Sequence, residues 1–314
     1  MKVTNSLLLE KFLSSTGIST DTRKIEKGNL FFALKGPNFN ANILAKEALE
    51  KGASYAVIDD PEFDLGDNTL LVQDGLKALQ DLALQYRKTL TIPIIGLTGS
   101  NGKTTTKELI FSVLSQKYQC FATAGNLNNH IGVPLSILSI KPNDEIAVIE
   151  MGANKQGDIK ELVDIAQPTH GLITNIGKAH LEGFGGIEGV KKGKGELFDF
   201  LAQNSSTVFL PEIKNVVHEM YAERVFSKTI LANQEMPIQL VASTPTIIYQ
   251  TTSGEKITTQ LPGVYNFENI QMAIAIGKHF NLTDEACNQG IANYLPSNHR
   301  SQFIKSGSNQ VLMD

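Results

Sequence analysis

A glycine-rich segment followed by lysine and threonine carries the strongest chemical signal in the sequence. It runs from Gly99 to Thr106, directly after the apolar run Ile94–Leu97 and directly before a predicted helix. Glycines let a backbone wrap around phosphates, and a helix N-terminus offers them N–H groups and a positive dipole end. Lys103 adds a positive charge, and the Thr104 hydroxyl suits Mg²⁺. Although Leu97 occupies the first glycine position of the strict spacing, this order of elements favours a phosphate loop over a simple helix cap.

A carboxylate at the end of a second predicted strand is the expected partner of such a loop. Glu150 follows the apolar residues Ile146–Ile149 and precedes the turn Met151–Asn154. Mg²⁺ bound to phosphates prefers carboxylate oxygens, usually supplied from the end of a neighbouring strand. An acid that ends a strand is often only a solvated boundary residue, but beside a phosphate loop Glu150 indicates a metal ligand.

Three further segments hold polar residues whose role the spacing alone leaves open. His180 follows the predicted strand Gly171–Asn175, at the edge where open α/β sheets collect ligands. Lys194 lies in a lysine-rich predicted helix, and its spacing indicates a solvated basic face. The asparagine-rich run Gly125–Pro134 is typical of a loop held by side-chain hydrogen bonds, and polar recognition of a ligand is the alternative.

Short β-rich runs alternate with amphipathic helical stretches, which predicts α/β layers. In the first 90 residues, strands are predicted at Leu30–Leu34, Tyr55–Ile58 and Thr69–Val72, and helices at Asn42–Lys51 and Gly75–Lys88. A domain boundary is expected near residue 90, because a long helix ends there and a fully apolar strand begins.

Beyond that boundary, apolar runs predict a doubly wound, mostly parallel sheet whose strands are buried on both faces. Its strands are expected at Ile94–Leu97, Ile146–Glu150, Gly171–Asn175 and Thr207–Leu210. A peripheral hairpin is predicted at Ile247–Gln250 and Lys256–Leu261, and a helix at Phe267–Phe280. Gln310–Asp314 begins an apolar strand without a successor, so the chain is expected to stop inside a domain.

Composition and charge exclude several classes of protein. The 28 Lys and Arg against 32 Asp and Glu give a net charge of −4, without the basic excess that a nucleic-acid-coating protein needs. The two cysteines, Cys120 and Cys287, exclude a disulfide framework and suit a reducing compartment. Neither a signal peptide nor a bilayer-spanning apolar run is found, so a cytoplasmic protein without a membrane span is expected.

Taken together, these motifs resemble the Mur ligase family, and the resemblance covers almost the whole chain. The segments that carry it are Asp21–Arg23, Leu30–Gly36, Thr98–Thr105, Asn126–Pro134, Glu150–Asn154, Thr174–Gly177, His180–Glu182, Lys194–Glu196, Gly263–Asn269 and Arg300–Gln302. The shifted first glycine of the phosphate loop is itself the family form. One departure is Asn40-Ala41-Asn42, where family members commonly show Asp-Gly-His.

The resemblance implies a role for each matching residue. The ATP site would comprise Gly99, Ser100, Asn101, Gly102, Lys103, Thr104, Thr105, Asn266, Asn269 and Arg300, with the two later asparagines near adenine and Arg300 reaching the phosphates. The catalytic group would be Lys103, Glu150, His180 and Lys194, and the Mg²⁺ ligands would be Thr104, Glu150, His180 and, once carbamylated, Lys194. The substrate site would comprise Asp21, Thr22, Arg23, Lys35, Asn126, Asn128 and Asn129.

The resemblance also implies an α/β fold in three parts. Residues 1–90 would form a small N-terminal domain for the UDP end of the substrate, residues 91–297 a central ATP-binding domain, and residues 298–314 the first strand of a truncated, Rossmann-like C-terminal domain. The implied reaction belongs to peptidoglycan synthesis: a monomeric enzyme uses ATP and Mg²⁺ to add D-alanyl-D-alanine to UDP-N-acetylmuramoyl-tripeptide through an acyl phosphate. Because the closing domain is almost absent, this chain alone is expected to turn over poorly.

Two other functions stay open at this point. Another Mur-type ligase or a folylpolyglutamate-synthetase-like ligase would share the central core, although the folate enzymes lack the N-terminal segment. A non-catalytic nucleotide-binding module would share the phosphate loop. Such a module needs no second metal site, whereas Glu150, His180 and Lys194 together imply one.

Overall fold

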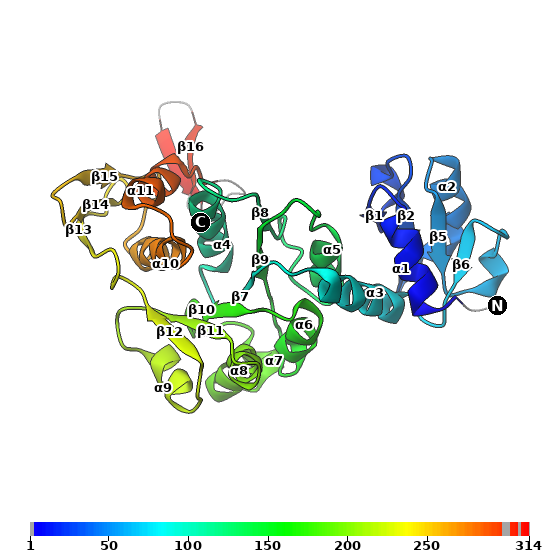
Figure 1. Ribbon diagram of the computed structural model, residues 1–314, viewed down its shortest axis with the longest axis horizontal. Helices are drawn as coiled ribbons and strands as arrows, with labels where there is room; N and C mark the ends of the chain where they lie inside the picture. Colours follow the sequence, from blue (N-terminus) through cyan, green and yellow to red (C-terminus); the bar gives the residue numbers. More distant parts are fainter. Residues whose placement is uncertain (1–2, 297–301, 307–308, 314) are drawn as a thin grey trace. The chain divides into compact units, whose positions relative to one another are not determined.

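The computed structural model describes residues 3–296, 302–306 and 309–313, and the chain divides into two compact units. The first unit comprises Met1–Thr91, His130–Pro142 and Asp164–Ala166, and the second comprises Ile92–Asn129, Asn143–Val163 and Gln167–Asp314. Each unit is built from helices and a mainly parallel sheet (Figure 1). Within the described ranges, none of the helices has the length and hydropathy needed to cross a bilayer.

The first unit is built on a four-stranded parallel sheet in the order β1-β2-β5-β6. Its strands are β1 (Ile18–Ser19), β2 (Leu30–Phe32), β5 (Tyr55–Ile58) and β6 (Thr69–Leu71), and a short ribbon pairs β3 (Lys35–Gly36) with β4 (Phe39–Asn40). Its helices are α1 (Asn5–Leu13), α2 (Ala45–Glu50), α3 (Gly75–Thr89) and α5 (Gly132–Leu138), with 3-10 turns at Thr22–Lys24, Ala41–Leu44 and Pro61–Phe63. Because parallel strands end at one edge, the residues that follow β1, β2 and β5 gather there.

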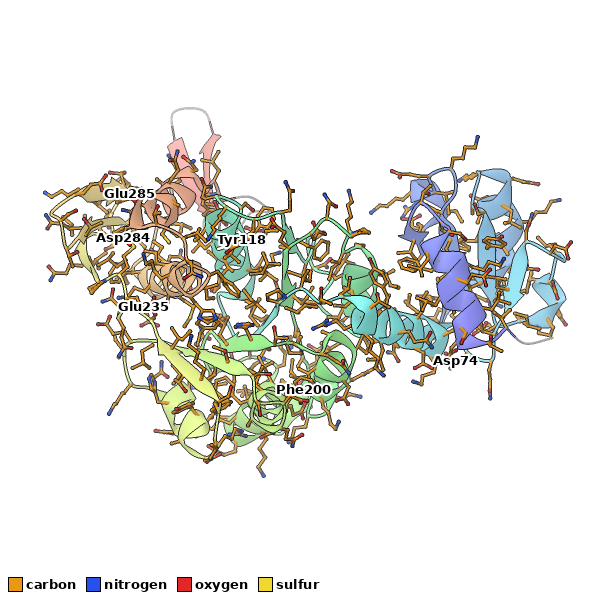
Figure 2. All side chains as sticks on the ribbon, viewed as in Figure 1. Asp74, Tyr118, Phe200, Glu235, Asp284 and Glu285 are labelled. Atoms are coloured by element: carbon orange, nitrogen blue, oxygen red, sulfur yellow. The ribbon has the colours of Figure 1, made fainter. Side chains whose placement is uncertain are left out.

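Helix α3 anchors the later segments of this unit. Asp74, labelled in Figure 2, accepts a 2.8 Å hydrogen bond from the backbone N–H of Lys77 and so caps its amino end. Near its other end, the Tyr86 hydroxyl donates to the carbonyl of Ile140 at 2.7 Å. Arg87, which is buried, donates to the carbonyl of Ala166 at 2.8 Å. These bonds attach residues distant in sequence to the first unit.

The second unit contains a six-stranded, fully parallel sheet in the order β12-β11-β10-β7-β9-β8. Its strands are β7 (Ile94–Thr98), β8 (Cys120–Ala122), β9 (Ile146–Glu150), β10 (His170–Ile173), β11 (Thr207–Leu210) and β12 (Lys228–Leu231). The helices of this part of the chain are α4 (Lys103–Leu114), α6 (Asp158–Ala166), α7 (Leu181–Phe184), α8 (Ile187–Gln203), α9 (Val216–Ala222), α10 (Asn266–His279) and α11 (Asp284–Asn293). Helices α4 and α10 cover one face of the sheet and α8 covers the other (Figure 1).

This sheet confirms the predicted doubly wound α/β class. Every residue of β7 and β9 is buried, as expected for central strands covered on both faces. From β7 the chain moves to β8 on one side, and from β10 it moves to β11 and β12 on the other. The loops after β7 and β10 therefore flank the topological switch point, where open α/β sheets bind ligands.

Several peripheral strands differ from the expectation. β8 and β12 were not predicted, because they are short, outer strands whose side chains are only partly buried. The predicted hairpin is present as β14 (Ile248–Thr251) and β15 (Lys256–Thr258), and β13 (Ile238–Ala242) extends it to three strands. At the carboxyl end, the structure has two antiparallel strands, β16 (Gln302–Ser306) and β17 (Asn309–Met313), where one was expected. The sequence prediction overlooked the apolar pair Phe303-Ile304 inside β16.

Candidate functional site

The phosphate loop leaves β7 and enters α4 without a side-chain cap. Gly99 has a φ of 156°, and a Cβ there would lie 1.9 Å from Thr174 Oγ1, so a side chain does not fit. Gly102 adopts the left-handed conformation at a φ of 77° and starts the helix. Lys103 Nζ donates to the carbonyls of Gly99 at 2.8 Å and Ser100 at 3.2 Å. A lysine charge and the positive end of the α4 dipole therefore lie at the same loop.

The loop after β10 holds the phosphate loop in shape. Ser100 donates its backbone N–H to the carbonyl of Asn175 at 3.0 Å, and its hydroxyl exchanges hydrogen bonds of 3.1 and 2.8 Å with Gly177. The Asn175 carboxamide accepts from the backbone N–H of Asn101 and donates to its carbonyl, both at 3.0 Å. Backbone and side-chain bonds thus fix both loops that flank the switch point, as a preorganised binding site requires.

Glu150 ends β9 and is 1% exposed. Its Oε1 accepts a hydrogen bond from Thr104 Oγ1 at 3.3 Å and another from Asn128 Nδ2 at 2.8 Å. Its Oε2 has no hydrogen-bond partner among the residues that the structure describes, and Lys107 Nζ lies 3.9 Å from it. A buried carboxylate oxygen without a partner is costly, and a hard cation is a group that would satisfy it. Glu150 and Thr104 therefore fit a Mg²⁺ site.

The asparagine-rich loop contributes one residue to this cluster. Asn128 donates to Glu150, and its backbone carbonyl accepts from the N–H of Gly152 at 2.7 Å, so it bridges two turns of the site. Asn126 and Asn129 are exposed. Contact of these asparagines with a substrate stays a prediction.

Lys194 is buried in α8, whereas its spacing alone predicts a solvated basic face. Its Nζ lies 5.5 Å from the centre of the Phe184 ring, and the residue is 2% exposed. Burial, with repulsion from Lys103, lowers the pKa of Lys194 to about 8. A neutral amine is the nucleophilic form of lysine, which suits the implied carbamylation, although that modification stays a prediction.

The structure does not collect His180 into a cluster of acids and histidines. His180 is exposed and adopts the left-handed conformation, at a φ of 52°, just before α7. In the part of the chain that is described, no group of three or more His, Cys, Asp or Glu side chains is arranged to hold a metal ion. The second Mg²⁺ position stays a prediction, and Arg300 lies outside the described residues.

Asn266 and Asn269 lie at the start of α10, buried against the phosphate-loop helix. Asn269 donates to Asn266 Oδ1 at 2.8 Å and accepts from the Thr106 hydroxyl at 3.0 Å. A Cβ on Gly102 would lie 3.3 Å from Asn269 Oδ1, so the Asn269 amide packs closely against the phosphate loop. Contact of either asparagine with adenine stays a prediction.

The predicted substrate residues of the first unit follow β1 and β2. Asp21 accepts hydrogen bonds from Arg23 Nε at 2.9 Å and Nη2 at 2.8 Å, and these bonds lower the pKa of Asp21 to about 2. Thr22 is buried. Lys35 lies 2.9 Å from Asp59 Oδ1 and is exposed. Asp21 and Lys35 thus lie at the carboxyl-end edge of the first sheet, the edge where such sheets bind ligands.

Two residues that lie next to Glu150 in the structure were not predicted from the sequence. Lys107 and Thr123 both contact Glu150: Lys107 lies near its Oε2, and Thr123 Oγ1 accepts the Glu150 N–H at 3.0 Å. For Lys107 a signal was available, because residues three apart share a helix face and Thr104 is three residues earlier. For Thr123 none was available, because β8 itself was not predicted.

Comparisons with known proteins support the resemblance. Residues 97–277 match the Mur ligase middle domain. The chain is 34% identical over 296 residues to the UDP-N-acetylmuramoyl-tripeptide–D-alanyl-D-alanine ligase of Bacillus subtilis (strain 168), which covers 93% of this chain and 65% of that protein. It is 35% identical over 314 residues to the ligase of the same name from Escherichia coli (strain K12), with 95% and 67% covered. The chain thus spans about two thirds of the length of these relatives.

Solved structures show the same similarity. A crystal structure of MurF from Acinetobacter baumannii matches with a TM-score of 0.80 at 27% identity, over 98% of this chain and 72% of that one. The family match spans more than half of the chain, and the similarity to the curated relatives extends over both units. The chain belongs to the Mur ligase family, and within it to the group of UDP-N-acetylmuramoyl-tripeptide–D-alanyl-D-alanine ligases.

Proposed function

We propose that the protein containing this chain is an ATP-dependent ligase that joins D-alanyl-D-alanine to UDP-N-acetylmuramoyl-tripeptide, with release of ADP and phosphate. The observation that carries the proposal is the cluster of Lys103, Thr104 and Glu150 at the switch point, with Glu150 Oε2 lacking a hydrogen bond within the described ranges. The names of the most similar curated relatives supply the substrates. Because this chain spans about two thirds of their length, activity and substrates are proposed for the whole protein.

The proposed nucleotide site uses charge and backbone dipoles. Thr104 and Glu150 would hold Mg²⁺, which when bound neutralises phosphate charge. Lys103 adds a positive charge from the same loop, and the N-terminus of α4 orients the phosphates. Phosphoryl transfer depends mainly on positioning and on neutralised charge, which is what these groups supply.

The proposed chemistry solves the low reactivity of a carboxylate toward amines. A carboxylate oxygen of the tripeptide attacks the γ-phosphorus, and ADP leaves, so that an acyl phosphate forms. The D-alanyl-D-alanine amine then attacks the acyl carbon, phosphate leaves, and the amine loses a proton. Lys194, once carbamylated, would present an anionic oxygen toward metal, and its burial beside Phe184 supports that role.

The remaining assignments follow the same proposal. Residues 1–90 would bind the uridine end of the substrate through Asp21, Thr22, Arg23 and Lys35, residues 91–297 would bind ATP, and residues 298–314 would begin a C-terminal ligase domain. The positions of Asp21 and Lys35 at the carboxyl-end edge of the first sheet support the first of these. A monomeric state and a cytoplasmic location stay predictions.

The decisive experiment measures phosphate release by the natural protein that contains this chain. UDP-N-acetylmuramoyl-peptides of increasing length are supplied with Mg-ATP, with and without D-alanyl-D-alanine, and products are identified by mass spectrometry. We expect one amide bond to form for each phosphate released, and only when UDP-N-acetylmuramoyl-tripeptide and D-alanyl-D-alanine are both present. Amide formation with a folate and glutamate would instead identify the folylpolyglutamate-like alternative. Nucleotide binding without any amide product would identify a non-catalytic module.

A further inference from the structure

Lys107 is a buried lysine that the proposed mechanism does not use. Its side chain is 3% exposed, and it lies on α4 three residues after Thr104, on the same helix face. Its Nζ donates to the carbonyl of Thr123 at 2.8 Å. Two acids lie near it: Glu150 Oε2 and Glu108 Oε1, each 3.9 Å from Nζ.

Charge balance links Lys107 to Glu150. A buried cation is costly unless an opposite charge compensates for it. Glu108 is 19% exposed and accepts a 2.6 Å hydrogen bond from the Tyr294 hydroxyl, so Glu150 is the more deeply buried of the two acids. A separation of 3.9 Å exceeds hydrogen-bond distance. Lys107 therefore balances the charge of Glu150 Oε2 without engaging that oxygen as a hydrogen-bond donor.

Lys107 also connects the elements that surround the carboxylate. Thr123, whose carbonyl accepts from Lys107, receives the backbone N–H of Glu150 on its hydroxyl at 3.0 Å. Thr123 begins the loop that carries Asn128, and Asn128 Nδ2 donates to Glu150 Oε1. One lysine on the phosphate-loop helix thus contacts both the strand end that bears Glu150 and the start of the loop that orients it.

We propose that Lys107 is a positioning residue for the metal-dependent part of nucleotide binding. It keeps Glu150 Oε2 in place and in charge balance without donating a hydrogen bond to it, so that the oxygen is available to Mg²⁺. It acts through Glu150 rather than by touching the phosphates. The inference rests on the proposed Mg²⁺-nucleotide site.

Calorimetric titration with ADP tests this role, once with Mg²⁺ and once with EDTA. For Lys107→Met, we expect the affinity in Mg²⁺ to fall about tenfold, as for other residues that orient metal ligands, while the affinity in EDTA stays within about twofold of the wild type. Lys256→Met removes an exposed lysine from the β14–β15 hairpin and should change neither affinity. Equal losses in both conditions would indicate a purely structural lysine, and no loss in either would also overturn the proposal.

A second metal and a second variant of Lys107 extend this test, and neither depends on the enzyme assay. Mn²⁺ bound in the presence of ADP, followed by electron paramagnetic resonance, should weaken in parallel with the Mg²⁺ affinity of Lys107→Met. If Lys107→Met fails to fold, Lys107→Gln keeps a donor for the Thr123 carbonyl and must show the same selective loss. A wild-type protein whose ADP affinity does not depend on Mg²⁺ would instead contradict the proposed function itself.

Discussion

Each unit of the molecule has a carboxylate at the end of a parallel strand, and the two are satisfied very differently. In the first unit, Asp59 follows β5, and its Oδ1 lies 2.9 Å from Lys35 Nζ and accepts from Asn42 Nδ2 at 2.8 Å. Its Oδ2 accepts from the backbone N–H of Gly75 at 3.1 Å. In the second unit, Glu150 likewise receives an asparagine amide on one oxygen, but its lysine stays 3.9 Å from the other.

This difference fits a structural role for Asp59 and the proposed ligand-binding role for Glu150. Burial alone would raise the pKa of Asp59, but hydrogen bonds from Lys35, Asn42 and Gly75 outweigh it and lower that pKa. Its bonds hold the ribbon after β2 and the start of α3 together. Glu150 Oε2 lacks such a donor within the described part of the chain, which agrees with its proposed role as a metal ligand.

Loss of the Lys103 charge should slow the reaction more than any other change considered below. In the natural protein, Lys103→Ala should slow phosphate release about a thousandfold, roughly 4 kcal/mol of transition-state stabilisation, because a charge at the phosphates is lost. Initial rates with all substrates saturating measure this effect. Lys256→Ala, at an exposed position, serves as the control. Near-normal turnover of Lys103→Ala would refute the assignment of the phosphate loop.

Neutralising each carboxylate tests whether Glu150 and Asp59 differ in function. Glu150→Gln should lower the affinity for Mg-ADP about a hundredfold, because it removes the negative charge of the proposed metal ligand. Asp59→Asn, the matched change in the first unit, should leave that affinity unchanged. Calorimetry on both variants provides the measurement. A similar loss from both changes would show that the two carboxylates do not differ in function.

A substitution at Asn42 tests how much the hydrogen bonds around Asp59 stabilise the first unit. This fully buried residue donates to Asn40 Oδ1 at 2.7 Å and to Asp59 Oδ1, and it accepts the Asp59 N–H at 3.0 Å. Asn42→Ala should destabilise the first unit by about 2 kcal/mol, because it leaves buried polar groups unpaired. Thermal unfolding should show a midpoint several degrees lower, with ADP binding unchanged. Asn38→Ala, in the exposed turn between β3 and β4, should leave the midpoint unchanged.

The smallest effect concerns a polar cluster at the opposite edge of the central sheet. His170 Nε2 lies 3.1 Å from His279 Nε2, and burial, with repulsion from His279 and Lys228, lowers the pKa of His170 to about 4. Between about pH 6.5 and pH 4 the unfolded state binds more protons, so stability should fall as the pH falls through this range. His170→Gln should reduce the loss between pH 6.5 and pH 5 by about 1 kcal/mol in urea unfolding. An unchanged pH dependence would contradict this account.

Local sequence was sufficient to predict the central fold and the neighbourhood of the Gly99–Thr106 loop and Glu150. Apolar runs such as Ile146–Ile149 predict buried parallel strands, and Gly99–Thr106 after such a run predicts the phosphate loop. The position of Glu150 could be predicted because ligand residues gather at the ends of parallel strands. The short, half-buried strands β8 and β12 lack that apolar signal, so they were missed.

The remaining features depend on contacts between residues far apart in sequence. Lys194 lies near Lys191 and Lys192, and its burial comes from packing beside Phe184 in α7, which spacing along one helix does not reveal. Asn42 and Asp59 are 17 residues apart, and their hydrogen bonds require the assembled sheet edge. The lack of a hydrogen bond to Glu150 Oε2 within the described residues likewise depends on where Lys107 and Asn128 lie after folding.

A crystal structure of this chain with Mg²⁺ and a non-hydrolysable ATP analogue would show which side chains contact the phosphates and the metal. We expect the phosphates to lie against the loop from Gly99 to Thr105, with the metal on the Thr104 hydroxyl and Glu150 Oε2 turned toward it. A nucleotide bound elsewhere, or a metal site in which Glu150 Oε2 has no part, would refute the proposed nucleotide site.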